Sequence, residues 1–458
     1  MKFLWLATLL LTIAPAYSAE VIEIHGKNLD QLPKGKEADG IIGDFVLRND
    51  KVSALISGNS PLRRPNMSAF YGDGNETPGC LYDLSLRNAT NDQITIFSPC
   101  FQKGKVSYVE PLTDLPDGEA GVETFTSAAK NLGLSISHQY RLKEGWQGIL
   151  ITSTFHNTTD QTKTQNIYDH WTQMRLTGQI KDIRWADAID PDDKCGYAVG
   201  WVAENGGIEF VNKRITKRAG RELNVEIQPN ERVIISRFLA IGHSPAEAVG
   251  EVAARKTPEL VDEVHLTLAG DHLERVSLDL DPTNKNTPPA YAVDGALKFK
   301  YFKGDYTAAL LDNGRVDQEV LFSIEHGAPH QSTVKLPPQA RVHFEITTGD
   351  NQDTPCKVQF HPAKGTGRPN LGPTDRAAGC SDQWHSATGK FSVGLPSGEY
   401  RVVVSRGPEY SLYRQQIKLT PETEVTVKGK IDRVIDTTGW VSTDFHNHST
   451  PSGDNTCG

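Results

Sequence analysis

The chain has 458 residues, of which 48 are Lys or Arg and 57 are Asp or Glu, so its formal net charge is −9. This acidic balance, with scattered signs and no run of Lys and Arg, excludes nucleic acid as the expected partner, because a phosphate backbone is bound through clustered positive charge. The length is too great for one ordinary core and predicts about three domains.

The first 18 residues have the order of a secretory signal peptide. Lys2 supplies the positive charge, residues 3–14 form an apolar run, and Ala16 and Ser18 are small residues that suit cleavage after Ser18. A membrane anchor is the alternative, but about a dozen apolar residues are too few to cross a hydrocarbon core roughly 30 Å thick. No later segment is long and apolar enough to do so. We therefore expect a secreted or periplasmic protein with no membrane span.

Residues 19–257 are expected to form one large β-sandwich domain. Segments rich in Ile, Val, Thr and Phe are bounded by turn residues, as at 93–97, 148–155 and 232–241. One helix is predicted over 246–256, because Ser244 can cap it, Pro245 suits its first position and Pro258 stops it. We place a domain boundary after this helix.

The pattern of residues 43–47, 66–67, 81–84 and 140–143 resembles the supersandwich of galactose-mutarotase-like proteins, which implies a carbohydrate partner for this domain. Asp169, His170 and Trp171 combine a carboxylate, an imidazole and an aromatic face that suit a pyranose; a packed or surface histidine is the alternative. An acidic loop could bind Ca²⁺ or could simply be solvated, and its members are Asp187, Asp190, Asp192 and Asp193.

An internal repeat relates residues 295–306 to residues 389–400 at a constant offset of 94 residues. In both copies an alternating strand reaches a turn of Gly, an acidic residue and Tyr, and a second apolar strand leaves it. A period of this length fits one small sandwich. We therefore predict two β-sandwich domains, at 258–337 and 338–430. The second resembles the carboxypeptidase-regulatory-like domain, which usually positions a neighbouring domain.

Six cysteines in an exported chain are compatible with disulfides, because export leads to an oxidising compartment. Proximity in sequence suggests the pairs Cys80 with Cys100 and Cys356 with Cys380. Each bond would stabilise the fold by roughly 3 kcal/mol in the chain-entropy model. Buried free thiols are the alternative.

The residues that suggest chemistry lie within 431–458. Asp444, His446 and His448 alternate at the end of a strand predicted at 440–445, so their side chains would project from one face. Two imidazoles spaced in this way can reach one metal ion at about 2.0–2.1 Å, and Asp444 could orient a ligand or bind the metal directly. A pair of surface or hydrogen-bonded histidines is the alternative, because a bare His-x-His is a weak motif.

The string Asp-x-His-x-His-Ser-x-x-Ser-Gly-Asp, residues 444–454, resembles the opening motif of the PHP (polymerase and histidinol phosphatase) metallohydrolases. Within them it is most similar to the CehA/McbA group, named for carbaryl hydrolase. The resemblance implies two or three divalent ions, Zn²⁺, Mn²⁺ or Fe, with His446 and His448 as the first ligands and Asp454 as another candidate. Asp454 lies six residues after His448, one more than the commoner family spacing. Such ions lower the pKa of bound water and polarise a phosphoryl or carbonyl oxygen.

The sequence thus predicts a mainly β fold, with several β-sandwich domains in tandem and only the first strand of a C-terminal (β/α) barrel present. The expected function is the N-terminal portion of an exported metal-dependent hydrolase that acts on a small-molecule phosphoester, carbamate or other ester. Because two imidazoles do not complete such a site, we expect this fragment to be inactive and the reading frame to continue after Gly458. The alternative is a carbohydrate-binding or adhesive β-sandwich protein without catalysis, and the residues encoded after Gly458 would separate the two.

Overall fold

A computed structural model describes residues 18–35, 38–65, 76–167, 169–171, 177–188, 194–202, 215–216, 223–372, 379–441, 443 and 445. Within these ranges the chain is mainly β, with several separate sheets and one α-helix, so the predicted fold class of tandem β-sandwiches is confirmed. Short 3₁₀ turns lie at Leu29–Gln31, Pro99–Phe101 and Pro258–Leu260. No helix in the described ranges is long and apolar enough to cross a membrane.

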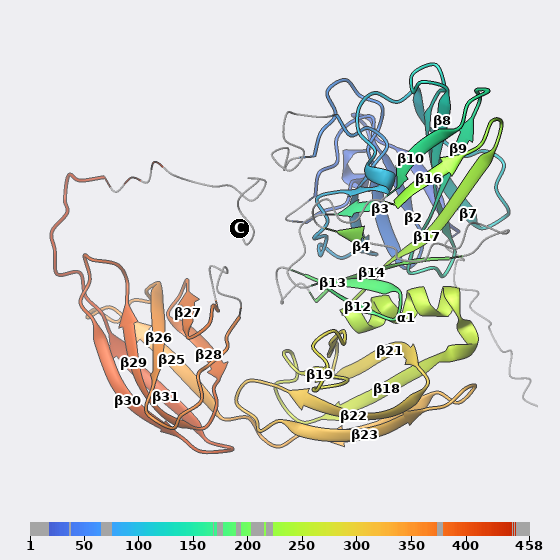
Figure 1. Ribbon diagram of the computed structural model, residues 1–458. Coiled ribbons are helices and arrows are strands. Elements are labelled where there is room, and N and C mark those ends of the chain that lie inside the picture. The colour runs from blue at the N-terminus through green and yellow to red at the C-terminus, as the bar shows by residue number, and fades with distance from the viewer. Residues whose placement is uncertain are drawn as a thin grey trace, which may run out of the picture.

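The first unit contains two large sheets and a short pair of strands (Figure 1). One sheet has the order β1-β2-β3-β4-β5-β11-β15, formed by β1 (Glu20–Glu23), β2 (Phe45–Arg48), β3 (Val52–Ile56), β4 (Leu81–Leu86), β5 (Phe97–Ser98), β11 (Asp169–Trp171) and β15 (Ile215–Thr216). The other has the order β12-β13-β14-β17-β9-β8-β7-β6, formed by β6 (Tyr108–Pro111), β7 (Glu119–Thr126), β8 (Leu134–Lys143), β9 (Gly148–Asn157), β12 (Thr177–Ile180), β13 (Ile183–Asp187), β14 (Gly196–Trp201) and β17 (Arg232–Gly242). β10 (Lys163–Ile167) pairs with β16 (Leu223–Ile227).

A hydrophobic core lies between the two large sheets. It takes Leu47 and Leu84 from one sheet and Tyr140, Ile151 and Leu239 from the other. Successive side chains of a strand point to opposite faces, so each strand supplies the core with every second residue. The Tyr140 hydroxyl, which is buried with its ring, donates a hydrogen bond to the Gly79 carbonyl at 2.8 Å. The core therefore includes a polar atom without leaving it unsatisfied.

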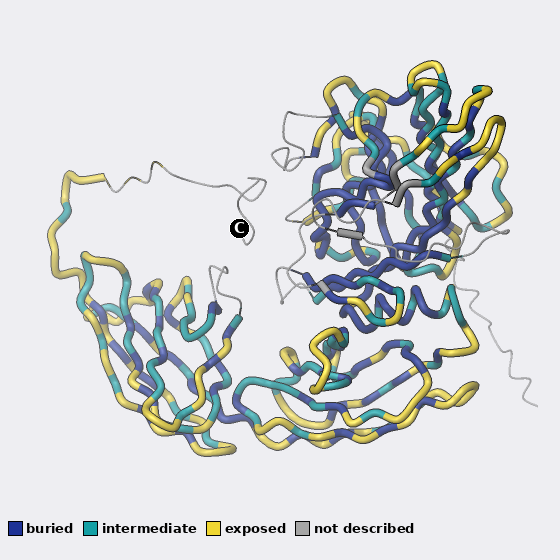
Figure 2. Tube along the Cα trace, in the orientation of Figure 1, coloured by how far each residue is buried: buried dark blue, intermediate teal, exposed yellow. Residues whose placement is uncertain are grey.

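Helix α1 (Pro245–Lys256) begins where the sequence predicted, and its Ser244 hydroxyl accepts a hydrogen bond from the Glu247 amide at 3.3 Å. Its small apolar side chains are buried, and they belong to one hydrophobic cluster that also includes residues of the first unit and of the strands that follow (Figure 2). At Gly250 an added Cβ would come within 2.0 Å of the Lys300 carbonyl oxygen, so glycine permits the close approach of the helix to the next unit. The helix therefore joins two units through a shared core.

The second unit is a sandwich of a three-stranded and a four-stranded sheet. The order β21-β18-β24 comes from β18 (Val261–Ala269), β21 (Ala296–Phe302) and β24 (His330–Lys335). The order β20-β19-β22-β23 comes from β19 (Ser277–Asp279), β20 (Ala290–Tyr291), β22 (Gly304–Leu311) and β23 (Gln318–Ile324). β18 is antiparallel to β21 and parallel to β24.

The third unit repeats this topology strand for strand. Its sheets have the orders β28-β25-β31 and β27-β26-β29-β30, formed by β25 (Arg341–Thr347), β26 (Cys356–Pro362), β27 (Gln383–Ser386), β28 (Lys390–Gly394), β29 (Gly398–Ser405), β30 (Tyr413–Leu419) and β31 (Glu424–Lys430). As in the second unit, the first strand is antiparallel to the fourth and parallel to the last. The two segments related by the sequence offset thus occupy equivalent strands.

A tyrosine fixes the same turn in both copies of the repeat. Tyr306 donates a hydrogen bond to the Phe302 carbonyl at 2.6 Å, and Tyr400 donates one to the Pro396 carbonyl at 2.7 Å. Gly304 and Gly398 precede the tyrosines with φ of +148° and +147°, a conformation that disfavours other residues. The turn of Gly, acidic residue and Tyr is therefore a structural device of the sandwich, comparable to a tyrosine corner.

The strand predicted at 440–445 is absent from the residues of this stretch that the structure describes. Ile431 is still buried in the third unit, but Trp440 and Val441 are each 82% exposed and Phe445 is 95% exposed. A strand needs a neighbouring strand for its backbone hydrogen bonds, and none of the described strands pairs with this segment. The prediction of a strand is therefore wrong for these residues.

Candidate functional site

The three units meet around the segment of residues 270–276, which connects β18 to β19. The Trp185 indole of the first unit donates a hydrogen bond to the Asn286 carbonyl of the second at 2.9 Å. Arg275 of the second unit donates one to the Leu371 carbonyl of the third at 3.0 Å. These contacts place side chains from distant parts of the sequence at one junction.

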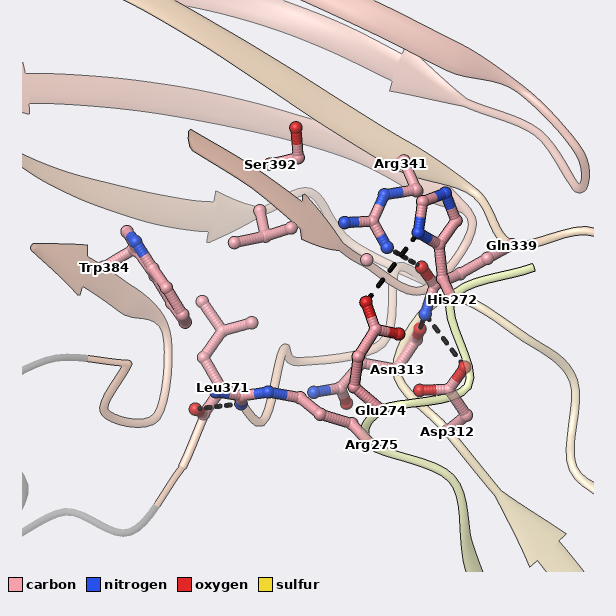
Figure 3. Close-up of a pocket in the computed structure, with 12 residues that line it drawn as sticks. His272, Glu274, Arg275, Asp312, Asn313, Gln339, Arg341, Leu371, Trp384 and Ser392 are labelled. Atoms are coloured by element: carbon pink, nitrogen blue, oxygen red, sulfur yellow. Dashed lines mark hydrogen bonds and ion pairs between the residues drawn. The ribbon is translucent and has the colours of Figure 1, made fainter. Parts of the chain in front are cut away.

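A cavity of about 140 Å³ lies between the second and third units (Figure 3). Polar side chains from both units surround it, namely His272, Glu274, Arg275, Asp312, Asn313, Gln339, Arg341, Trp384 and Ser392. A neighbouring groove of about 540 Å³ shares several of these residues and extends to Asp187 and Lys194 of the first unit. We call the cavity and this groove the junction cleft.

Asp312 is the most buried acid of the cavity. Its side chain is 3% exposed and forms an ion pair with Arg315, and the Gln339 amide donates a hydrogen bond to its Oδ2 at 2.8 Å. Its Oδ1 has no hydrogen-bond partner among the described residues. Burial raises the pKa of Asp312 to about 6, although the Arg315 charge acts in the opposite direction. The cavity thus contains a buried acceptor that is still available.

Arg341 supplies the complementary donor. One of its terminal nitrogens donates a hydrogen bond to the Gln339 side chain, whereas its Nε is buried and has no partner among the described residues. Burial lowers the pKa of the Arg341 guanidinium, and the Glu274 and Asp312 carboxylates partly offset this. A buried donor and a buried acceptor, both without partners, are the usual features of a site that binds a small polar molecule.

Trp384 does not offer a free ring to a sugar. Phe391 stacks on it with ring centroids 6.0 Å apart at an interplanar angle of 15°, and the Arg275 guanidinium lies 5.4 Å from the centroid of the Trp384 ring. The junction cleft can therefore recognise a ligand by hydrogen bonds and charge, with no stacking contribution from this ring.

The predicted metal ligands Asp444, His446, His448 and Asp454 lie outside the described residues. The described ranges contain no group of three or more His, Cys, Asp or Glu that could hold a metal ion. The proposed metal site thus remains a prediction from sequence.

Of the two alternatives for Asp169, His170 and Trp171, the structure shows the packed histidine and not the sugar site. All three residues are at most 2% exposed in β11. Arg237, from β17, pairs with the Asp169 carboxylate at 2.6 Å, so this acid neutralises a buried cation. Burial lowers the pKa of His170 to about 3 and keeps it neutral at ordinary pH. The sequence had given no reason to expect the buried Arg237.

Only one acid of the predicted Ca²⁺ loop lies within the described ranges. Asp187 is 4% exposed and accepts a hydrogen bond from the Tyr291 hydroxyl at 2.5 Å, across the contact between the first and second units. Asp190, Asp192 and Asp193 lie outside the described residues, so the Ca²⁺ hypothesis stays a prediction.

The predicted disulfides are not formed. Cys80, Cys100 and Cys356 are buried free thiols, the alternative that the sequence left open, and Cys380 is buried without a bond to Cys356. The Cys80 sulfur lies 3.7 Å from the Ser98 hydroxyl, and the Cys100 sulfur lies 3.3 Å from a guanidinium nitrogen of Arg237. Burial raises the pKa of Cys80 and Cys100 to about 12, and that of Cys356 to about 11. Proximity in sequence was therefore a poor guide to where these sulfurs point.

Comparison with known proteins gives no family. No family model matches the chain, and no curated protein matches it. A TPR-domain-containing protein from Parabacteroides distasonis is 10% identical, with a TM-score of 0.26, over 45% of this chain and 48% of that one. The polysaccharide lyase BACCELL_00875 is 11% identical, with a TM-score of 0.24, over 54% of this chain and 45% of that one. The heparan sulfate lyase HepC from Pedobacter heparinus is 9% identical, with a TM-score of 0.26, over 65% of this chain and 43% of that one. The chain thus spans about half the length of these proteins or less, and neither fold nor function follows from likenesses this distant.

Proposed function

We propose that the chain is part of an exported metal-dependent hydrolase in which His446 and His448 are the first two metal ligands. The substrate class is a phosphoester, a carbamate or another ester. The proposal depends on the spacing Asp444-x-His446-x-His448, which brings two imidazoles and a carboxylate to one short stretch of chain.

The donor set fits a divalent ion of intermediate softness. Imidazole nitrogens suit Zn²⁺ and Fe²⁺, and a nearby carboxylate such as Asp444 or Asp454 suits Mn²⁺ and adds negative charge. A bound ion of this kind lowers the pKa of its water toward 7 and so supplies hydroxide at neutral pH. The residues of this chain would hold and orient the ion, and further ligands are needed for turnover.

The approach to the motif supports the proposal. Arg433 bridges to Tyr410 in the third unit and pairs with Glu409 at 3.0 Å, so the chain is held by the sandwich shortly before the motif. Beyond this point Trp440 and Phe445 carry large apolar side chains that are almost fully exposed. Exposed large apolar side chains of this kind are typical of a surface that another polypeptide segment covers.

A titration with Zn²⁺ tests the proposal on this chain. We expect weak binding of an ion by the wild-type protein and loss of that binding in the double variant His446→Ala/His448→Ala. The matched control is His265→Ala/His326→Ala, which removes two histidines from the second unit and should leave binding unchanged. Equal binding by the wild type and the first double variant would contradict the proposal.

Carbohydrate binding without catalysis remains the second candidate, and the junction cleft favours it. Oδ1 of Asp312 and Nε of Arg341 are an acceptor and a donor without hydrogen-bond partners among the described residues, and such atoms suit the hydroxyl groups of a sugar. Under this function the double variant Asp312→Asn/Arg341→Met would lose binding to a glycan on an array, and the two histidine substitutions would not affect it. If the Asp312→Asn/Arg341→Met variant kept glycan binding and the histidine double variant lost it, the result would favour the hydrolase.

A further inference from the structure

The four-stranded sheet of the third unit turns one face inward and one face outward. Val358, Phe360 and Val402 are buried in the core, so the residues that alternate with them on β26 and β29 point away from it. The outward residues of the four strands are mainly basic or amide side chains. We call this surface the basic face, and it consists of Lys357, Gln359, His361, Gln383, His385, Glu399, Arg401, Val403, Ser405, Arg414, Gln416 and Lys418.

The register of the strands places the cations of the basic face close together. Arg401 is opposite His361 on one side and Gln416 on the other, and Arg414 is opposite Val403. Arg401 and Arg414 are therefore diagonal neighbours on one face, at a spacing of roughly 7–8 Å. This spacing lets both guanidinium groups contact anionic groups on one extended chain.

Positive charge on this face is largely uncompensated. The four cations face a single carboxylate, that of Glu399, which pairs with Lys418 at 3.3 Å. Within the described residues no ion pair engages Lys357, Arg401 or Arg414. The Lys357 charge, after burial, is the second cause that lowers the pKa of His385, which agrees with a positive potential over the sheet.

The equivalent sheet of the second unit shows that the fold does not require this charge. Its strands β19, β20, β22 and β23 contain no Lys or Arg, and Asp279, Asp305 and Glu319 are among the residues that alternate with its core residues. Two copies of one sandwich thus carry opposite charge on the same surface. The basic face is therefore present in the third unit and not in the second.

The chemistry of the surface favours one class of polyanion. A groove of about 490 Å³ covers part of it and is lined by His361, Arg401, Gln416 and Lys418 among others. Basic side chains pair with carboxylate or sulfate groups, and the amide side chains between them can bond to hydroxyl groups. The outward positions of these strands contain no Phe, Tyr or Trp on which a nucleobase could stack, and only Val403 is aliphatic, which leaves little to insert into a membrane.

We propose that the basic face binds a linear acidic polysaccharide, whose carboxylate or sulfate groups lie against Arg401, Arg414 and Lys357. Binding is electrostatic in the main and weakens as salt rises. It is independent of any metal at His446, because the face belongs to the third unit and uses none of the residues of the motif.

Binding of the whole chain to immobilised polygalacturonate, dextran sulfate and neutral dextran tests the proposal. We expect retention on one or both acidic polymers and none on dextran. The double variant Arg401→Gln/Arg414→Gln should weaken retention on the order of tenfold at low salt, because two contacting charges are removed. The control Lys298→Gln/Lys335→Gln removes the same charge from exposed positions on the three-stranded sheet of the second unit and should bind as the wild type does.

Several results would overturn the proposal. The first is the absence of binding to either acidic polymer. The second is an equal loss of retention in the control variant, because it would indicate an effect of net charge only. Tighter binding to duplex DNA or to phosphatidylglycerol vesicles than to both polymers would assign the face to another partner. Thermal unfolding of each variant verifies that it is folded, and surface substitutions of this kind are expected to change stability little.

Discussion

The buried ion pair between Arg237 and Asp169 gives the sharpest test of the first unit. Both side chains are 0% exposed, and the Arg237 Nη2 donates to the Asp169 Oδ1 at 2.7 Å. The substitution Arg237→Met keeps much of the side-chain length and leaves the carboxylate buried without its cation. Removal of one partner from a buried pair costs about 3–5 kcal/mol, so we expect the free energy of unfolding to fall by that amount.

Urea unfolding followed by tryptophan fluorescence measures the effect. The matched control is Arg48→Met, because Arg48 pairs with Glu20 at the same short distance of 2.7 Å but Glu20 is 51% exposed. An exposed pair contributes about 0–1 kcal/mol. The double variant Arg237→Met/Asp169→Leu should recover part of the loss, because it leaves no uncompensated charge. If Arg237→Met were no more destabilising than Arg48→Met, the reasoning about burial would be wrong.

Three further predictions concern stability and thiols. Tyr306→Phe and Tyr400→Phe should each destabilise their unit by about 1 kcal/mol, because each removes a hydrogen bond. Thermal unfolding measures the effect, and the control is a Tyr→Phe change at a tyrosine without such a bond. Burial lowers the pKa of His138 from 6.5 to about 3, so its contribution to stability is present above pH 6.5 and is lost as the pH falls toward 3. His138→Gln should therefore flatten the decline of unfolding free energy over that range, and an unchanged decline would contradict the assignment. Finally, alkylation in denaturant without reductant should label Cys356 and Cys380, and protection of both would show that they form a disulfide after all.

The elements that local pattern determines were predictable from the sequence. Helix α1 needed only a cap at Ser244, a proline after it and a second proline beyond its end. The repeated turn at Tyr306 and Tyr400 was visible because the same residues recur at one offset, and the structure shows why they recur. Such features depend on neighbours within a few residues.

The remaining features depend on partners that are far apart in sequence. Arg237 lies on the same face of β17 as the buried Val233 and Ile235, where alternation predicts an apolar side chain, and its partner Asp169 is 68 residues away. The junction cleft combines Asp312 of one unit with Arg341 of another, and nothing in either strand pattern marks them as a pair. The cysteine prediction failed for the same reason, because separation along the chain does not tell where a buried sulfur points.

Metal analysis of the protein purified from its source, together with an assay of ester and phosphoester hydrolysis, tests the central claim most directly. We expect bound divalent ions, loss of hydrolysis on chelation and recovery when the ion is restored. Replacement of both His446 and His448 by alanine should abolish the metal content and the activity together. A metal-free protein, or full hydrolysis by the variant that lacks both imidazoles, would contradict the account.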